Sequence, residues 1–312
     1  MIKKRLDLKV GFSCNNFCRH CVQAHKRDWG DKSTERIKRE LKEGREDGVS
    51  DLVLTGGEPT IRKDIIDLVK YAKELGYETI QIQSNGRMFS YKPFCEKLIK
   101  AGVNEFGPAL NGHIPELHDF LSSSSGAFKQ TVQGIKNLKE LNQRVITNTV
   151  VTKPNYRYLP EIATLFVKLG VDQFQFAFVH AGGNAWKNFE MIVPRVSLAA
   201  PYIHKGLQIG IDAGIKVMAE AMPYCVMKGY ERYVSELYIP ETEVMDAKDK
   251  IKSFTISRQK EGKTKFPQCK KCKYELICEG PWREYPQKMG AKEFQPVEGK
   301  KIKSITEILN VV

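Results

Sequence analysis

The feature that most constrains the fold is the alternation of strand and helix patterns along the first two-thirds of the chain. Short runs rich in β-branched and aromatic residues alternate with longer segments of helical periodicity. Alternation of this kind predicts a parallel sheet with right-handed crossovers. The predicted strands are 5–12, 51–58, 77–86, 103–112, 144–153 and 171–180, and the predicted helices are 31–48, 62–76, 92–102, 126–142 and 159–170.

This pattern is compatible with an open sheet and with a closed or partial barrel. In each case ligands bind on the loops that follow the carboxyl ends of the strands. The chain places its unusual residues in such loops. They are a cysteine loop after the first strand, TGGEP (55–59) after the second, QSNG (83–86) after the third and LNG (110–112) after the fourth. The sequence therefore predicts a ligand site at this end of the sheet.

The cysteine loop contains Cys14, Cys18 and Cys21 in a C-x3-C-x2-C spacing. Three thiolates in one compact loop can reach three corners of a cubane iron–sulfur cluster. Zinc with an open coordination position is the alternative, and His20 is then a possible fourth ligand. An all-thiolate trio without a carboxylate is unusual for catalytic zinc. The chemistry of the set favours a [4Fe–4S] cluster with one iron open to an outside ligand, and His20 beside it.

The loop after the second strand combines Gly56 and Gly57 with Glu58. Glycines allow a backbone to approach a ligand closely, and a glutamate can accept hydrogen bonds from a ligand ammonium group. A glycine pair alone would fit any turn between a strand and a helix. Its occurrence shortly after the cysteine loop indicates a shared ligand site.

With these motifs, the chain resembles the radical S-adenosylmethionine (SAM) superfamily over residues 5 to about 180. The resemblance rests on the cysteine spacing and on GGEP at 56–59, with support from QSNG and from ALNGHIPELHD (109–119). The chain departs from the family pattern at His20, where an aromatic residue is preferred, and at Asn111, where aspartate is commoner.

The resemblance implies an α/β fold, a partial (β/α)6 TIM-like barrel that shields a radical from water. It implies that Cys14, Cys18 and Cys21 hold the cluster and that SAM occupies the open iron. An electron from a flavodoxin- or ferredoxin-type donor then cleaves SAM, and the resulting 5′-deoxyadenosyl radical abstracts a substrate hydrogen. The SAM contacts implied by the family motifs are Gly56, Gly57, Glu58, Pro59, Ser84, Asn85 and Asn111.

A second cysteine group lies near the end of the chain. Cys269, Cys272 and Cys278 follow a C-x2-C-x5-C spacing, and Cys225 is the nearest additional thiol. The group resembles the single-cluster form of the auxiliary regions called SPASM and twitch, which implies a second [4Fe–4S] cluster. Structural zinc is the alternative, and the spacing leaves open whether the protein supplies three or four ligands. We expect a radical SAM barrel over residues 1–215 and an auxiliary-cluster region over 216–312.

Two single residues carry alternative interpretations. Cys95 lies at an apolar position of a helical pattern, which is typical of a buried structural thiol. His180 ends the sixth predicted strand. It is a candidate substrate contact, and the alternative is a hydrogen-bonded structural histidine.

Charge and hydropathy limit the possible partners. The formal net charge is +13, which suits an anionic partner such as RNA, although scattered lysines are equally typical of a solvated surface. The sequence has no apolar run of about 18 residues or more, and its first residues do not resemble a secretory signal. We therefore expect a cytoplasmic protein without a membrane partner.

The predicted activity is radical modification of a peptide or protein side chain, by crosslinking or by oxidation. Oxidation or rearrangement of a small molecule, nucleotide or cofactor precursor is the first alternative, and tRNA modification is the second. A non-catalytic iron–sulfur or zinc-binding protein would not need the GGEP loop or the polar residues at the strand ends.

Overall fold

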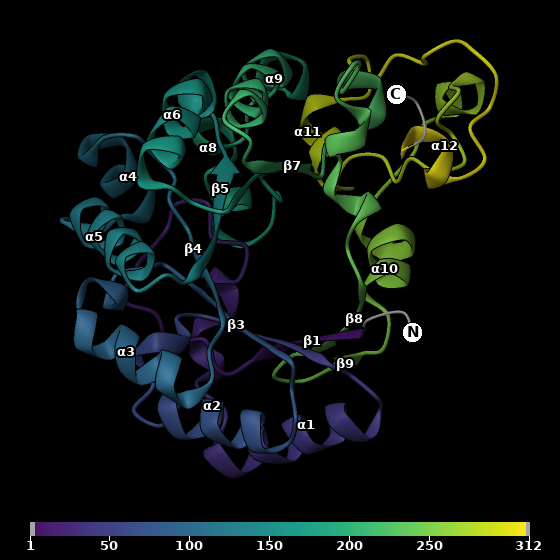
Figure 1. The fold of residues 1–312 in the computed structure, drawn as a ribbon. Coiled ribbons are helices and arrows are strands. Elements are labelled where there is room, and N and C mark those ends of the chain that lie inside the picture. Colours follow the sequence, from purple (N-terminus) through teal and green to yellow (C-terminus); the bar gives the residue numbers. More distant parts are fainter. Residues whose placement is uncertain (1–3, 310–312) are drawn as a thin grey trace.

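The computed structural model describes residues 4–309 and contains a curved sheet with helices on its outer side (Figure 1). The order of the strands in this sheet is β7-β6-β5-β4-β3-β2-β1-β8-β9. All neighbouring strands are parallel except β8 and β9, which are antiparallel. The strands are β1 (Lys4–Lys9), β2 (Asp51–Thr55), β3 (Thr79–Ser84), β4 (Glu105–Pro108), β5 (Arg144–Val151), β6 (Gln173–Phe178), β7 (Lys216–Glu220), β8 (Glu241–Met245) and β9 (Lys250–Ile251).

The helices follow the strands along the chain and cover the outer face of the sheet. Buried leucine, isoleucine, valine and phenylalanine side chains fill the space between the two layers. The α-helices are α1 (Thr34–Glu46), α2 (Ile65–Glu74), α3 (Lys92–Ala101), α4 (Pro115–Ser122), α5 (Ala127–Glu140), α6 (Leu159–Leu169), α7 (Gly183–Lys187), α8 (Phe189–Ile192), α9 (Val196–Asp212), α10 (Phe254–Ser257), α11 (Tyr285–Met289) and α12 (Ile305–Leu309).

The helix ends follow their local sequence. The Ser33 side chain accepts a hydrogen bond from the Arg36 backbone N–H (3.2 Å) and caps α1, satisfying one of its free donors. α6 carries Pro160 in its first turn, where no helical hydrogen bond is lost. The same helix ends at Gly170, which adopts a left-handed conformation with φ 67°.

All six strands expected from the sequence are present, but the sheet continues beyond them. β7 pairs with β6 at one edge, and β8 pairs with β1 at the other. These two strands come from the region after residue 215, which was expected to be the auxiliary-cluster region. Each has only five residues, which is too short for periodicity to distinguish a strand from a loop.

β7 and β8 do not pair with each other, so the barrel is partial. Figure 1 shows α11 and α12 on the side of the ring between these two strands. An isolated bridge between Ala219 and Val234 joins the C-terminal region to β7. The C-terminal region therefore lies where a closed barrel would have further strand pairing.

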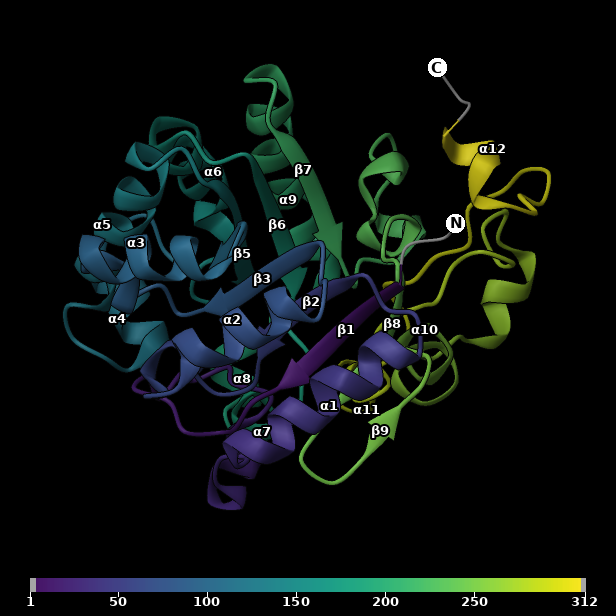
Figure 2. The ribbon, with the colours of Figure 1, turned by 60° about the horizontal axis from the view of Figure 1, so that its bottom comes forward.

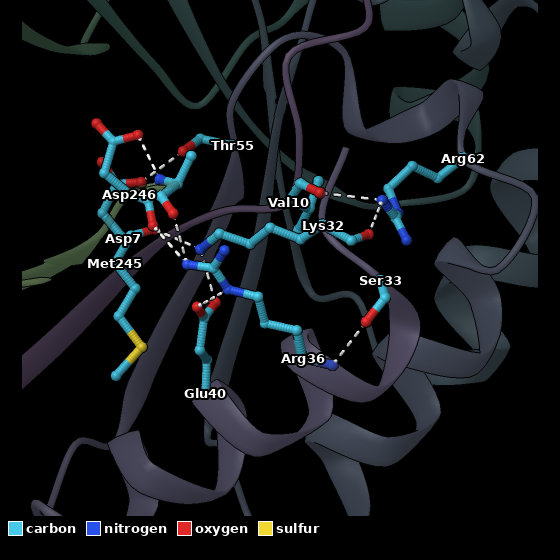
Figure 3. Close-up of polar contacts among 11 residues, drawn as sticks. Asp7, Val10, Lys32, Ser33, Arg36, Glu40, Thr55, Arg62, Met245 and Asp246 are labelled. Carbon is cyan, nitrogen blue, oxygen red and sulfur yellow. Dashed lines mark hydrogen bonds and ion pairs between the residues drawn. The ribbon is translucent and has the colours of Figure 1, made fainter. Parts of the chain in front are cut away.

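The carboxyl end of β8 is fastened to the segment that follows the cysteine loop (Figure 3). The Lys32 ammonium donates to the Met245 carbonyl (3.0 Å) and to Glu40 Oε2 (2.6 Å). The Arg36 guanidinium donates to the Ala247 carbonyl (2.7 Å), and Lys26 pairs with the Asp246 carboxylate. We call the contacts of residues 245–247 with Lys26, Lys32 and Arg36 the β8 latch.

The inner face of the sheet is polar. Burial lowers the pKa of the Arg5 guanidinium in β1. The nearby carboxylates of Asp7, Glu220 and Glu105 act in the opposite direction and balance its charge. Gln175 of β6 donates a hydrogen bond to Glu220 of β7 (2.5 Å). The interior of the barrel thus offers hydrogen-bonding groups along its wall, unlike the apolar layer beneath the helices. No helix within residues 4–309 is long and apolar enough to cross a membrane.

Candidate radical SAM site and second cysteine pocket

The loop with the first three cysteines is half-buried at the carboxyl end of β1. Burial, and after it repulsion from the neighbouring Cys21 and Cys14 thiols, raises the pKa of Cys18 to about 12. Burial also raises the pKa of Cys14 and of Cys21, while the Arg27 guanidinium acts in the opposite direction on all three. Three buried thiols that repel one another as thiolates require a cationic partner, as an iron–sulfur cluster provides.

The two glycines of the GGEP loop pack against the backbone that leads into the cysteine loop. A Cβ on Gly57 would lie 2.2 Å from the Ser13 carbonyl oxygen, and one on Gly56 would lie 2.2 Å from the Gly11 carbonyl oxygen. Gly57 N–H donates to the Gly11 carbonyl (2.7 Å), and Glu58 N–H donates to the Ser13 carbonyl (2.8 Å). Only residues without side chains allow this approach, so the glycines hold the start of the cysteine loop in position.

The Glu58 side chain is buried and braces the ends of β2 and β3. Its Oε1 accepts hydrogen bonds from the Thr60 backbone N–H (3.1 Å), the Thr60 hydroxyl (2.5 Å) and the Ser84 hydroxyl (2.7 Å). Its Oε2 accepts one from the Asn85 backbone N–H (2.6 Å). Burial raises the pKa of Glu58, and these hydrogen bonds act in the opposite direction. The observed partners are all protein groups, so a direct contact of this carboxylate with SAM stays a prediction. Pro59 follows and begins a short 3-10 helix.

Asn85 and Arg87 connect the end of β3 to the cysteine loop. The Asn85 side-chain amide donates to Asn15 Oδ1 (2.6 Å). Arg87 Nη1 donates to the Asn15 carbonyl (2.7 Å) and to Asn16 Oδ1 (2.9 Å). Asn85 was predicted at this site from QSNG, whereas Arg87, Asn15 and Asn16 were not. An arginine directly after a strand-end glycine turn was the available signal for Arg87.

Asn111 lies buried at the end of β4 and joins it to β5. Its Oδ1 accepts a hydrogen bond from the Val150 backbone N–H (2.9 Å), and its own N–H donates to His118 Nδ1 (3.0 Å). Burial lowers the pKa of His118 to about 4. His20 of the cysteine loop is buried nearby, and its pKa is lowered to about 4, first by burial and then by His118. Both imidazoles are therefore neutral at physiological pH. Like Glu58, Asn111 joins two neighbouring strand ends through hydrogen bonds.

The loop after β6 holds the cysteine loop from the opposite side. Asn184 N–H donates to the Cys21 carbonyl (2.9 Å), and its side chain donates to the Cys18 carbonyl (3.0 Å). Gly183, with φ 54°, leaves no room for a Cβ, which would lie 2.5 Å from the Val22 carbonyl oxygen. The cysteine loop is thus fixed by the loops after β2, β3 and β6.

His180 also lies in the loop after β6, but its observed contacts are with the C-terminal region. Its ring stacks on Trp282 (4.1 Å between centroids, 4° between planes), and its Nε2 lies 3.2 Å from Glu284 Oε2. Burial acts to raise the pKa of Glu284, but the contact with His180 outweighs it and the pKa is lowered. The predicted substrate contact of His180 stays a prediction, and its observed contacts are structural.

The structure brings the four remaining predicted ligands together in one pocket beside β7. Cys225 lies in a short 3-10 helix (Tyr224–Val226) just after β7. The pKa of its thiol is raised to about 12, first by burial and then by repulsion from Cys278, Cys272 and Cys269. Phe266, Phe294, Pro223 and Pro281 form apolar parts of the wall that all four cysteines share.

The donor set of this pocket fits an iron–sulfur cluster. Backbone N–H groups of Phe266 and Val297 donate to the sulfurs of Cys269 and Cys272 (both 3.4 Å), as hydrogen bonds to cluster thiolates do. Within residues 4–309, no three His, Cys, Asp or Glu side chains converge on a point where they could hold one metal ion. A cubane takes one thiolate at each iron, so its ligands surround it instead of meeting at one atom.

A group of buried charges lies between β7 and this pocket. Arg258 makes a bidentate ion pair with Glu279 (2.6 and 2.7 Å), and Lys263 Nζ lies 3.6 Å from Glu236 Oε1. Burial lowers the pKa of Lys263. Glu236 also accepts a hydrogen bond from the Ala221 N–H at the end of β7 (2.9 Å). These contacts connect the second cysteine pocket to the carboxyl end of the barrel.

Comparisons with known proteins agree with this arrangement. The family model for the radical SAM superfamily matches residues 8–174, more than half of the chain. The chain therefore belongs to the radical SAM superfamily, whose members are enzymes that use a [4Fe–4S] cluster and SAM. This confirms the family, the enzymatic class and the partial-barrel fold predicted from the sequence.

Two curated relatives illustrate the range of similar proteins. An AdoMet-dependent heme synthase of Oleidesulfovibrio alaskensis is 31% identical over 179 residues, which are 57% of this chain and 46% of that protein. A PqqA peptide cyclase of Rhodopseudomonas palustris is 28% identical over 236 residues, which are 72% of this chain and 62% of that protein. The aligned part thus spans about half the length of the first of these relatives.

Among solved structures, SuiB of Streptococcus suis bound to S-adenosylmethionine has a similar fold. The TM-score is 0.69 at 17% identity, and the match covers 95% of this chain and 76% of SuiB. SuiB bound to its precursor peptide SuiA matches 85% of this chain with a TM-score of 0.64. At this identity the likeness concerns the fold, and it extends over the C-terminal region as well as the barrel.

Proposed function

We propose that this protein cleaves SAM reductively and uses the resulting radical to modify a peptide or protein side chain. The observation that carries the SAM chemistry is the position of Cys14, Cys18 and Cys21. They lie in one loop whose backbone is held by three other strand-end loops at the carboxyl end of a parallel partial barrel. When bound there, the cluster supplies the electron that splits SAM into methionine and the 5′-deoxyadenosyl radical.

The residues of this chain have defined parts in the proposal. The three thiolates hold the cluster, and Arg27 offsets their negative charge. Gly56 and Gly57 let the backbone of the GGEP loop pack against the start of the cysteine loop, and Ser84, Asn85 and Asn111 fix the neighbouring strand ends. A site fixed in this way places SAM against the cluster without reorganising the loop, which lowers the cost of the reaction.

Two similar proteins support a peptide substrate, both through the peptides in their names and through the large share of this chain that they match. The PqqA peptide cyclase matches the larger part of this chain, and SuiB, solved with a precursor peptide, shares the fold over nearly all of it. The polar inner wall of the barrel suits a peptide, because carbonyl and N–H groups need hydrogen-bonding partners when they are buried.

A small-molecule substrate is the second candidate. The relative with 31% identity is named a heme synthase, and its match covers mainly the barrel. On this alternative the substrate is a cofactor precursor. RNA as a substrate rests only on the net charge of +13.

We also propose that Cys225, Cys269, Cys272 and Cys278 hold a second [4Fe–4S] cluster. Four thiols that line one apolar pocket, with Cys272 buried and the other three half-buried, support this assignment over zinc, as do the backbone N–H groups directed at two of the sulfurs. Ligation by four cysteines leaves no open iron, so the cluster would conduct electrons or stabilise the region instead of binding substrate.

The SAM chemistry is tested by reconstituting the protein with iron and sulfide under anaerobic conditions and adding SAM and dithionite. We expect 5′-deoxyadenosine from the natural sequence and none from Cys14→Ala, Cys18→Ala or Cys21→Ala. Cys95→Ala is the matched control, because Cys95 is a buried residue of α3 outside both cysteine groups, and its thiol donates to the Phe89 carbonyl (3.2 Å). Cleavage by any of the first three variants would refute the assignment.

The substrate class is tested by following the abstracted hydrogen. If the substrate is a peptide, a candidate precursor peptide prepared with deuterated side chains should transfer deuterium to 5′-deoxyadenosine. Transfer from a porphyrin precursor and not from the peptide would establish the small-molecule alternative.

A further inference from the structure

Three neighbouring strands bring polar side chains together on the inner wall of the barrel. Asn148 of β5 and Gln175 of β6 are register partners, and Glu220 ends β7, the next strand along the sheet. Figure 2 shows these three strands side by side. Side chains alternate between the two faces of a strand, and the sequence neighbours of all three residues are buried on the helix side. The three half-buried side chains therefore face the barrel interior, and we call them the inner-wall site.

The inner-wall site has hydrogen-bond acceptors that lack a full set of donors. Gln175 Nε2 donates to Glu220 Oε2 (2.5 Å), which is the one hydrogen bond that this carboxylate receives within residues 4–309. The Oδ1 atom of Asn148 is buried, and no donor in the described part of the chain reaches it. A buried acceptor without a donor is costly unless a bound group supplies one. The site thus lacks a hydrogen-bond donor.

The charges beside the inner-wall site leave Glu220 without a cationic partner. Arg258 pairs with Glu279 (2.6 Å), and Lys263 Nζ lies 3.6 Å from Glu236 Oε1. In the described part of the chain no cation lies within ion-pair distance of Glu220. Burial, and after it repulsion from Glu236, raises the pKa of Glu220, whereas Lys263 and Arg258 act in the opposite direction. The group holds three carboxylates and two cations, so one negative charge is in excess.

Arg5 of β1 does not remove this excess. It also favours the ionised form of Glu220, after Lys263 and Arg258. The same guanidinium interacts first with Asp7, and with Glu105 after Glu220. Its charge is therefore shared among several carboxylates of the wall, and a bound cation would still lower the free energy of an ionised Glu220.

The wall next to Glu220 is apolar. Val150, Ala177 and Glu220 are register partners across β5, β6 and β7, and all three are half-buried. A lysine or arginine side chain has an aliphatic stem and a charged head. Its stem can pack on Val150 and Ala177 while its head donates hydrogen bonds to Glu220 and Asn148. Charge-assisted hydrogen bonds of this kind are stronger than neutral ones.

We propose that the inner-wall site binds a lysine or arginine side chain of the substrate peptide. The proposal rests on the proposed function and names the kind of residue that such a peptide carries. Glu220 supplies the negative charge, Asn148 supplies a second acceptor, and Gln175 orients the carboxylate. Glu220 lies at the carboxyl end of β7, the end of the barrel at which the cysteine loop follows β1. A cationic side chain held there directs the neighbouring part of the peptide toward the SAM site.

The test measures binding without turnover. The probes are capped alanine pentapeptides whose central residue is lysine, arginine, norleucine or glutamate, so that the central side chain carries the only charge. Norleucine matches the lysine stem and lacks the ammonium group. Dissociation constants are measured by saturation-transfer NMR on the reconstituted protein with SAM and without a reductant.

We expect the natural protein to bind the lysine and arginine peptides about tenfold more tightly than the norleucine peptide, and the glutamate peptide most weakly. Glu220→Gln keeps an acceptor for Gln175 and removes the charge, so this preference should fall to about twofold or less. Asn148→Ala removes the neutral acceptor and should reduce the preference about threefold. The matched control is Glu105→Gln, the same change at the amino end of β4, where Glu105 pairs with Arg144 (2.7 Å). This control should keep the preference.

Other results would overturn the proposal. Equal affinity of the natural protein for the lysine and norleucine peptides, or tightest binding of the glutamate peptide, would exclude a cation subsite. An unchanged preference in Glu220→Gln, or an equal loss in Glu105→Gln, would exclude Glu220 as its specific charge. If circular dichroism shows that Glu220→Gln does not fold, Asn148→Ala decides, and a full preference in that variant rejects the site. Absence of 5′-deoxyadenosine from the natural protein with dithionite would contradict the proposed function, whereas the peptide affinities judge the subsite separately.

Discussion

At the scale of single residues, the side chains of the sequence motifs form hydrogen bonds that their residue types alone do not predict. Glu58 is predicted to contact SAM, which stays a prediction, and its carboxylate also accepts hydrogen bonds from Thr60, Ser84 and the Asn85 backbone. Ser84 and Asn85 were predicted as SAM contacts, and the structure shows them bound to Glu58 or to the cysteine loop. The sequence identifies the right loops, but the partners of each side chain depend on neighbouring strands.

Replacing Glu58 tests its role as a brace. Glu58→Gln places an amide N–H₂ where the carboxylate accepted hydrogen bonds, so at least one buried donor loses its acceptor. We expect the free energy of unfolding to fall by about 1–3 kcal/mol, the usual loss for a buried unpaired group. Urea denaturation of the reconstituted protein measures it, with Glu74→Gln at an exposed position of α2 as the control. An equal effect of the two substitutions would contradict the brace.

At the scale of elements, the long helices and the central strands follow from periodicity, whereas the edges of the sheet do not. β1 and β8 lie far apart in the sequence, and no local pattern in residues 241–245 shows that they pair. Their association is secured by the β8 latch, whose charged groups come from the segment after the cysteine loop. The latch therefore connects the second edge of the sheet to the SAM site.

The latch should depend on pH through Asp246. Burial acts to raise the pKa of Asp246, but the hydrogen bond from Lys26 and other contacts outweigh it, so the pKa is lower than the ordinary value of 3.8. A lowered carboxyl pKa contributes stability above the ordinary value, and this contribution is lost as the pH falls through the folded-state pKa. Asp246→Asn should cost about 1–3 kcal/mol, equally from pH 8 to about 5, and less below about pH 4.

Urea denaturation across this pH range measures the effect. The control is Glu140→Gln, which removes the exposed pair of Lys92 and Glu140 (2.9 Å) and should leave the free energy of unfolding nearly unchanged, because solvent screens an exposed ion pair. A loss for Asp246→Asn no larger than that of the control would show that the latch does not stabilise the protein.

At the scale of the whole molecule, the C-terminal region lies beside the open edge of the barrel and brings the second cysteine set next to β7. Cys225 comes from the loop after β7, while Cys269, Cys272 and Cys278 come from the last part of the chain. The buried ion pair of Arg258 and Glu279 lies between them and the barrel. The domain division at residue 215 stays a prediction, since β7 continues the barrel sheet just after it.

Iron content tests the second site. We expect about eight iron atoms per chain after reconstitution, four for each [4Fe–4S] cluster. Cys225→Ala should lower the content toward about four, because one corner of the second cluster loses its thiolate. Cys95→Ala, which removes a buried thiol outside both groups, should leave the iron content unchanged. Full iron content in Cys225→Ala would exclude Cys225 as a required ligand. Zinc instead of iron in the second pocket of the natural protein would establish a structural zinc site.

The sequence by itself determined the order of strands and helices in the barrel, the cysteine loop and the polar loops at the strand ends. These features depend on residues close together in the chain, where periodicity and spacing express local geometry. Only the tertiary structure decided that β8 completes one edge of the sheet, that Glu58 braces β3, and that Cys225 shares a pocket with Cys269. Such contacts join distant segments, and they form only when the burial of apolar helix faces brings those segments together.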